Sequence, residues 1–311
     1  MEGLPLRSLE AISALRGRGR ALAGYRRGAA LVVAAAFLLS GCSSGPVKFG
    51  WLPAPDLNTT NQTGRIIYLW NGSWIAALVI GVIVWGLTLW CIFAYRRRRD
   101  EVGIPAQVRY HLPLEVFYTV VPLIMVGVLF FFTVRDQTAI AAVHEKPDVT
   151  IGVVGKQWAW DFNYLNAPGA DDDVYESGVQ TLLDGRPAVE KEVPTLYLPV
   201  NKRIRFELNA RDVIHSFWIP AFLYKMDVVP GLTNEFELIP QRTGTFKGKC
   251  AELCGEFHSE MLFNVKVVSQ AQYDAHMIEL KARGQTGQLG TDLGRSTLPT
   301  NGPNATNGTD D

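Results

Sequence analysis

The chain has 311 residues, of which 48% are hydrophobic and 19% are charged, and its formal net charge at pH 7 is zero. This balance hides an uneven distribution, because residues 1–41 carry six arginines against two glutamates, whereas residues 136–311 carry 16 basic and 24 acidic side chains. Phosphates would repel the acidic C-terminal part, which excludes a nucleic-acid-binding function for the chain as a whole. The apolar composition excludes a disordered protein, and four cysteines are too few for a disulfide-dense scaffold.

The first 41 residues have the pattern of an export signal. Arg26 and Arg27 precede an apolar run at 28–39, which is too short to span a bilayer because a span needs ~20 apolar residues. The sequence Leu-Ser-Gly-Cys that ends at Cys42 resembles a bacterial lipobox, which implies cleavage before Cys42 and a lipid on its sulfur. Cleavage that leaves Cys42 unmodified is the alternative. We therefore predict a lipoprotein signal peptide at 1–41 and an outer N-terminal segment at 42–70.

Two longer apolar segments predict a transmembrane helical hairpin at 71–134. No charged side chain occurs from Ile66 to Tyr95, and the second apolar segment runs from about residue 114 to 134. The connecting loop 96–111 holds five arginines and two acidic residues, and such a basic excess is typical of a cytoplasmic loop. Both ends of the hairpin would then face outward. With the lipobox, this predicts a multi-pass protein in contact with the lipids of a bacterial plasma membrane.

Glu115 lies near the cytoplasmic end of the second predicted span. A carboxylate at that depth is costly unless it contacts water or a partner, so a functional role is one interpretation. The other interpretation is an interfacial side chain just outside the hydrocarbon. The residues themselves do not decide between the two.

From residue 135 onward the pattern changes to short strands separated by Pro and Gly, which predicts an all-β sandwich at 135–282. An amphipathic helix at 271–283 would close it. The acidic segment 166–194 is predicted to be a surface insertion between two strands. The Gly-, Asn- and Thr-rich residues 283–311 are predicted to be a disordered tail. The predicted strands cover residues 149–154, 203–208, 233–239, 244–249 and 262–268.

Two thiols, an imidazole and a thioether occur within twelve residues, at Cys250, Cys254, His258 and Met261, and His215 lies 35 residues before Cys250. Soft sulfur with imidazole selects copper, zinc or an iron–sulfur cluster. Zinc would use both Cys and both His and leave Met261 without a role, and a single blue-copper site would leave one Cys unused. Two coppers bridged by both thiolates would use all five residues. A Cys250–Cys254 disulfide is the structural alternative.

This pattern resembles subunit II of the haem–copper cytochrome c oxidases. The resemblance is carried by Asp-Val-Ile-His-Ser-Phe at 212–217 and by the Cys-x-Glu-x-Cys-x-x-x-His-x-x-Met loop at 250–261. It covers about residues 65–282 and implies a two-helix transmembrane hairpin followed by a cupredoxin-like Greek-key β-sandwich. The lipobox, the acidic insertion and the tail are similar to the actinobacterial members of this family.

The resemblance implies a role for each residue of the motif. The backbone carbonyl of Glu252 would be a weak metal ligand, and its side chain would point inward to help hold a magnesium ion shared with the catalytic subunit. The side-chain ligands of the dinuclear copper centre called CuA would be His215, Cys250, Cys254, His258 and Met261.

Two further residues match functional positions of the family. Trp158, in Gln-Trp-Ala-Trp at 157–160, falls on the Trp through which electrons enter, and a sandwich-core aromatic is the alternative. Glu115 falls on the carboxylate at the entrance of a proton pathway. Leu232 is a departure, because many members have Arg at this position after Pro-Gly, so the role of that Arg is not transferred. Three other histidines match no ligand position and are expected at the surface: His111, His144 and His276.

The implied function is that of subunit II of a respiratory cytochrome c oxidase. It would accept electrons from cytochrome c at CuA and pass them to haem in subunit I, for oxygen reduction coupled to proton pumping. The donor would be a soluble cytochrome c or a membrane-bound dihaem cytochrome c of a bc-type complex in a supercomplex. The alternatives are a membrane-anchored copper carrier or oxidase assembly factor, and a zinc-structured binding module.

Overall fold

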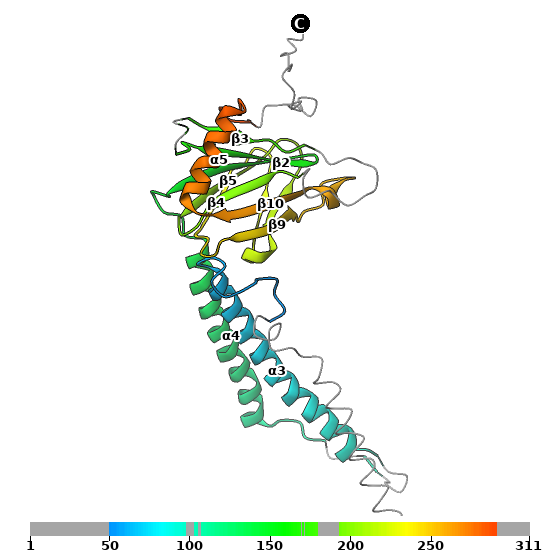
Figure 1. Cartoon of the computed structure of the whole chain (residues 1–311). Helices are drawn as coiled ribbons and strands as arrows, with labels where there is room; N and C mark the ends of the chain where they lie inside the picture. The colour runs from blue at the N-terminus through cyan, green and yellow to red at the C-terminus, as the bar shows by residue number, and fades with distance from the viewer. Residues whose placement is uncertain are drawn as a thin grey trace, which may run out of the picture. The chain divides into compact units, whose positions relative to one another are not determined.

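The computed structural model describes residues 50–97, 103–104, 107–168, 170, 172–179 and 193–290. The predicted signal peptide, Cys42 and the tail after residue 290 lie outside them. The first two elements are the long helices α3 (Thr63–Ala94) and α4 (Leu112–Ile140), which run side by side (Figure 1). Both are long and apolar enough to cross a membrane, and their most apolar stretches are not buried by the rest of the described chain.

Helix α3 begins at Thr63, before the predicted start of the first span at residue 71. Arg65 in its first turn pairs with Asp136 of α4 at 3.0 Å, and Arg135 approaches the same buried carboxylate at 2.9 Å. This pairing lets each apolar helix continue through a charged turn. The two helices are thereby joined where α3 begins and α4 ends.

The described chain from Val149 to Val268 forms a β-sandwich of two five-stranded mixed sheets. The predicted fold class, a helical hairpin followed by a β-sandwich, is therefore confirmed. The first sheet has the order β3-β2-β1-β5-β8, with β1 parallel to β5, and consists of β1 (Val149–Lys156), β2 (Ala159–Leu165), β3 (Val174–Glu176), β5 (Ile204–Ala210) and β8 (Asn234–Leu238). The second has the order β4-β10-β9-β6-β7, with β10 parallel to β4, and consists of β4 (Thr195–Pro199), β6 (His215–Ile219), β7 (Tyr224–Val228), β9 (Gly244–Cys250) and β10 (Leu262–Val268).

Aromatic side chains fill the space between the two sheets, because alternate residues of each strand face inward. Trp160 of β2 lies edge-on to Phe263 of β10, and Phe217 of β6 stacks on the same ring at 4.8 Å. All three side chains are buried. Gly248 of β9 lies beneath this layer, and a Cβ there would collide with the Phe263 ring. The aromatic layer therefore fixes β6, β9 and β10, the strands beside the predicted ligands.

The prediction that 166–194 is only a surface insertion is wrong for its first part. Strand β3 pairs antiparallel with β2, and Ala167, Ala170 and Val174 are buried in the core. These three small or branched apolar residues are enough to anchor a strand within an otherwise acidic stretch. Residues 180–192 of the predicted insertion lie outside the described part of the chain.

The prediction of disorder is wrong for the beginning of the tail. Gln285 forms a backbone hydrogen bond with Tyr175 of β3, and Gly287 forms one with Asp173, the residue before β3. Leu289 is held by two hydrogen bonds with the Asn163 side chain, at 3.0 and 2.9 Å. The tail is ordered here because the edge of β3 offers it backbone partners and β2 offers it the Asn163 side chain, which its own composition does not reveal.

Helix α5 (Gln270–Ala282) lies within one residue of the predicted amphipathic helix, and two 3-10 turns, η1 (Pro220–Phe222) and η2 (His258–Glu260), complete the domain. His276 of α5 is buried with its ring stacked on Tyr197 at 3.7 Å, so its expected surface position is wrong. Burial lowers the pKa of His276 to about 4. The expected exposure is found for His111 and His144.

The buried, uncharged His276 should make the β-domain sensitive to acid. Because its pKa falls from 6.5 in the unfolded chain to about 4, its contribution to stability is complete above pH 6.5 and is lost as pH falls toward 4. The loss is on the order of 3 kcal/mol. His276→Phe keeps a ring against Tyr197 but does not titrate. We expect its thermal midpoint to fall less than that of the unmodified chain between pH 7 and pH 5, measured by circular dichroism, and equal losses would contradict this.

Candidate metal centre

The predicted ligands come from two strands of the second sheet and from the loop between β9 and β10. His215 is the first residue of β6, and Cys250 is the last residue of β9. Cys254 and His258 lie in the loop, and Met261 directly precedes β10. The backbone N–H of Cys250 donates to the Met261 carbonyl at 3.0 Å, so strand pairing itself closes the loop.

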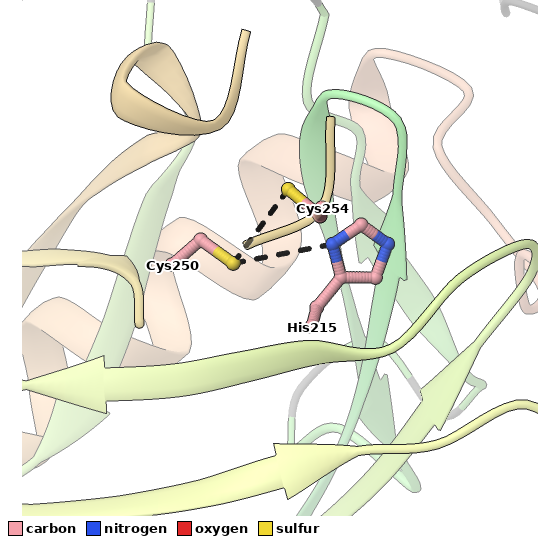
Figure 2. A group of neighbouring side chains, drawn as sticks. All are labelled: His215, Cys250 and Cys254. Carbon is pink, nitrogen blue, oxygen red and sulfur yellow. Dashed lines mark hydrogen bonds between the residues drawn. The ribbon is translucent and has the colours of Figure 1, made fainter. Parts of the chain in front are cut away.

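Figure 2 shows the Cys250 thiol between the Cys254 thiol and the His215 ring. The Sγ atoms of Cys250 and Cys254 are 3.9 Å apart, and His215 Nδ1 lies 4.0 Å from Cys250 Sγ. All three residues are buried, and their potential ligand atoms lie within 4.8 Å of one another. A disulfide requires sulfurs ~2.05 Å apart, so both cysteines are free thiols. Since a soft metal ion binds sulfur at ~2.3 Å, one ion can contact both thiols at this separation.

Each thiol also has its own weak donor. The backbone carbonyl of Glu252 lies 3.2 Å from Cys250 Sγ. His258 Nδ1 and Met261 Sδ lie 3.6 and 3.8 Å from Cys254 Sγ. With His215 beside Cys250, the donors divide into one imidazole and one weak donor for each thiol. This division favours two ions that share the sulfurs over a single ion.

The two thiols differ in acidity. Hydrogen bonding with the Cys254 thiol lowers the pKa of Cys250 well below its usual range, and the same contact raises the pKa of Cys254. One thiolate therefore forms readily, and a bound cation would favour the second, as metal binding to thiols generally does.

Asp212 orients His215. Its Oδ1 lies 2.9 Å from His215 Nε2, which leaves Nδ1 facing Cys250. Burial lowers the pKa of His215, but hydrogen bonding with Asp212 and Cys250 outweighs burial and raises the pKa overall. Asp212 itself accepts hydrogen bonds from the backbone N–H groups of Gln157 and Val213. A carboxylate on the second nitrogen of a histidine is the common arrangement around metal ligands, and the spacing of three residues was visible in the sequence.

Aromatic residues of the 157–160 stretch surround the loop. Trp158 is half-buried, packs edge-on against Phe257 at 4.8 Å, and donates from Nε1 to the Cys254 carbonyl at 3.2 Å. The Gln157 side chain donates to the same carbonyl at 2.7 Å. Trp160 is buried and donates to the carbonyl of a ligand residue, Met261, at 3.3 Å. The sequence predicted Trp158 at the site but did not predict the contacts that Gln157 and Trp160 make with the loop.

The remaining predicted residues lie apart from this cluster. Glu115 is in the first turn of α4, where its Oε1 accepts a hydrogen bond from the backbone N–H of His111 at 3.1 Å. The His111 ring accepts in return from the backbone N–H of Leu114. The Glu252 side chain, which was expected to point inward, is exposed. Cys42 lies outside the described residues.

Comparison with known proteins adds independent findings. Residues 149–268 match the family model described as cytochrome c oxidase subunit II, periplasmic domain. The chain is 46% identical to a probable cytochrome c oxidase subunit 2 of Streptomyces coelicolor, over 84% of this chain and 87% of the relative. It is 34% identical to cytochrome c oxidase subunit 2 of Mycobacterium bovis, over 84% of each chain. The solved periplasmic domain of subunit II of the Bradyrhizobium japonicum cytochrome oxidase is 33% identical, covers 45% of this chain and 99% of its own length, and gives a TM-score of 0.38.

Gly155 of β1 gives a direct test of the His215 position. A Cβ at residue 155 would lie 2.9 Å from His215 Cδ2, so Gly155→Ala must displace the imidazole. We expect at least about tenfold weaker Cu(I) binding, equivalent to ~1.4 kcal/mol, in competition with a chelator. Gly152→Ala on the same strand is the control, because its Cβ would make an ordinary 3.4 Å contact with Asn163. Equal affinities of the two variants would contradict the placement of His215 at the metal.

Proposed function

The chain belongs to the cytochrome c oxidase subunit II family, and we propose that it is the subunit through which electrons enter a respiratory terminal oxidase. It is a membrane-anchored protein whose β-domain lies on the outer face. The observation that carries the proposal is the division of the donors around two buried free thiols, with one imidazole and one weak donor beside each. This donor set fits the dinuclear copper centre CuA.

The chain would hold the copper pair with both thiolates of Cys250 and Cys254. The remaining donors would be His215, His258, Met261 and the Glu252 carbonyl, which supply one imidazole nitrogen and one weak donor for each copper. When bound, the pair supplies a one-electron redox couple. The ligands come from paired strands and from a loop whose ends are hydrogen-bonded to each other, so the protein would hold them in nearly one arrangement in both oxidation states.

We propose Trp158 as the residue through which electrons reach the ligands. Its half-buried ring is joined to Cys254 by a hydrogen bond, which gives a short bonded path from the surface. The acidic excess of residues 136–311 favours a basic donor surface, on a soluble cytochrome c or on a membrane-bound dihaem cytochrome c of a bc-type complex. The acceptor would be haem in subunit I, where oxygen reduction and proton pumping would occur.

Two carboxylates would serve the catalytic subunit. The exposed Glu252 side chain, on a residue whose carbonyl faces Cys250, is available to a magnesium ion at an interface. Glu115 would stand at the entrance of a proton pathway, in addition to its contact with the His111 backbone. Lipidation of Cys42, removal of residues 1–41 and location in a bacterial plasma membrane are proposals that rest on the sequence pattern.

The copper content of the chain tests the proposed function. The full chain in detergent, loaded with copper, should bind two coppers and give a seven-line EPR spectrum, because one unpaired electron is shared by two nuclei. Cys250→Ser should abolish this spectrum. Cys91→Ser is the matched control, since Cys91 is an exposed free thiol in α3. One copper per chain with a four-line spectrum and rapid loss to a chelator would favour the copper carrier instead.

The rate of electron uptake tests the proposed role of Trp158. Trp158→Phe keeps a ring beside Phe257 but loses the hydrogen bond to the Cys254 carbonyl. We expect reduction by ferrous cytochrome c in stopped-flow measurements to slow about tenfold or more, with the copper count and EPR spectrum unchanged. Trp218→Phe is the control. The Trp218 ring lies beneath the Lys249 ammonium group, and within the described residues its side chain donates no hydrogen bond to a carbonyl of the 250–261 loop. Equal rates for the two variants would remove Trp158 from the route.

A further inference from the structure

A buried cluster of charged side chains lies in the same domain as the metal centre but supplies none of its ligands. Asp161 of β2 is fully buried, and its Oδ1 accepts a hydrogen bond from Lys156 Nζ at 2.7 Å. Its Oδ2 pairs with Arg211 Nη2 at 2.8 Å. The side chains of the two cations are only 8% and 5% exposed, so all three charges are removed from water.

Stability alone does not account for this cluster. Taking ions out of water is costly, and well-packed apolar residues of similar volume are often at least as stabilising. Burial here is strong enough to lower the pKa of Lys156, although the neighbouring Asp161 opposes the shift. The carboxylate is also held in one orientation, because Ser177 Oγ and the backbone N–H of Gly178 donate to the same Oδ1 at 3.1 and 3.0 Å. A fixed geometry is what such an arrangement provides.

Lys156 is connected to Cys254 through the next residue of the chain. Lys156 is the last residue of β1 and is followed directly by Gln157. The Gln157 side chain donates to the Cys254 carbonyl at 2.7 Å. The position of Lys156 therefore helps to set where the loop that carries Cys254 is held.

Arg211 is connected to His215 through the next residue of the chain. Arg211 is followed directly by Asp212, whose carboxylate lies 2.9 Å from His215 Nε2. The Arg211 backbone N–H donates to the Gly155 carbonyl at 3.0 Å, which ties this segment to the end of β1. The two segments meet again where the Gln157 N–H donates to Asp212 at 2.8 Å.

We infer that Asp161 is a positioning residue for the metal centre. By holding Lys156 and Arg211, it fixes the two chain segments that orient Cys254 and His215. The inference rests on the proposed function, because it takes the two-copper centre as the group that these ligands hold.

The test compares Asp161→Asn with Asp173→Asn in the copper-loaded full chain. An amide has nearly the shape of a carboxylate but carries no charge, so Lys156 and Arg211 both lose the opposite charge that pairs with them. Asp173 is a suitable control because its carboxylate bonds Asn166 and Gln288. For Asp161→Asn alone, we expect about tenfold faster copper loss to a chelator, a changed histidine hyperfine coupling and a shifted reduction potential.

An Asp161→Asn protein with the copper release, hyperfine coupling and potential of the unmodified chain would overturn the inference. If this variant does not fold, Arg211→Lys decides, because it keeps a cation beside Asp161 but loses the guanidinium geometry. A changed histidine coupling in Arg211→Lys would support the inference, and an unchanged spectrum and potential would refute it. An unmodified chain without the two-copper spectrum would overturn the proposed function, and the inference with it.

Discussion

The thiols of Cys250 and Cys254 face each other across 3.9 Å in the protein interior without forming a disulfide, and the metal centre depends on this separation. Only three residues lie between the two cysteines, so a flexible loop could bring the sulfurs into bonding distance. Here the backbone is fixed on both sides. Cys250 is held by strand pairing to Met261, and the Cys254 carbonyl accepts hydrogen bonds from Gln157 and Trp158. Fixing the backbone keeps both thiols available to a metal.

The proposed ligands and the groups that orient them come from different sheets. His215, Cys250 and Met261 belong to or adjoin strands of the second sheet. Gln157 and Trp160 belong to the connection after β1 and to β2 of the first sheet, and their hydrogen bonds cross to the loop. Packing between the sheets therefore decides the distances at the site. A change in the aromatic layer would be felt at the ligands even though no ligand is altered, because protein interiors are close-packed and relax only partly.

The grouping of His215, Cys250 and Cys254 could be predicted because most of the proposed ligands lie in one loop, where residue type and spacing restrict the chemistry. Strands β1, β5, β8, β9 and β10 were predictable from their apolar or alternating patterns. Strand β2 was not assigned, since its polar residues Asp161 and Asn163 are buried as well as its aromatics. They are accommodated by Lys156, Arg211 and Leu289, which are distant in sequence or in another strand, and no local pattern encodes such pairings.

The errors about β3 and the tail are related, and the error about His276 has a different cause. A three-residue strand is too short for its period to be visible, and residues 284–290 are ordered by contacts with that strand and with the Asn163 and Arg211 side chains. His276 was a different case, because the helical period already placed it on the face of Tyr273, Met277 and Leu280, which are buried. The residue type of His276 favoured the surface, whereas its position on the helix favoured burial. In an amphipathic helix, the position is the stronger guide to burial.

Burial of three proposed ligands and exposure of their neighbours bear on how a partner would reach the proposed metal centre. His215, Cys250 and Cys254 are at most 4% exposed, whereas Leu253 in the same loop is 77% exposed and Ile214 is 47% exposed. Two apolar side chains beside the buried residues, Leu253 and Ile214, are therefore available to a partner, together with the exposed Glu252 and Glu256 of the same loop. These two carboxylates contribute to the acidic excess that would attract a basic partner over a long range. Attraction and close contact would then depend on the same loop, so a substitution there would change both.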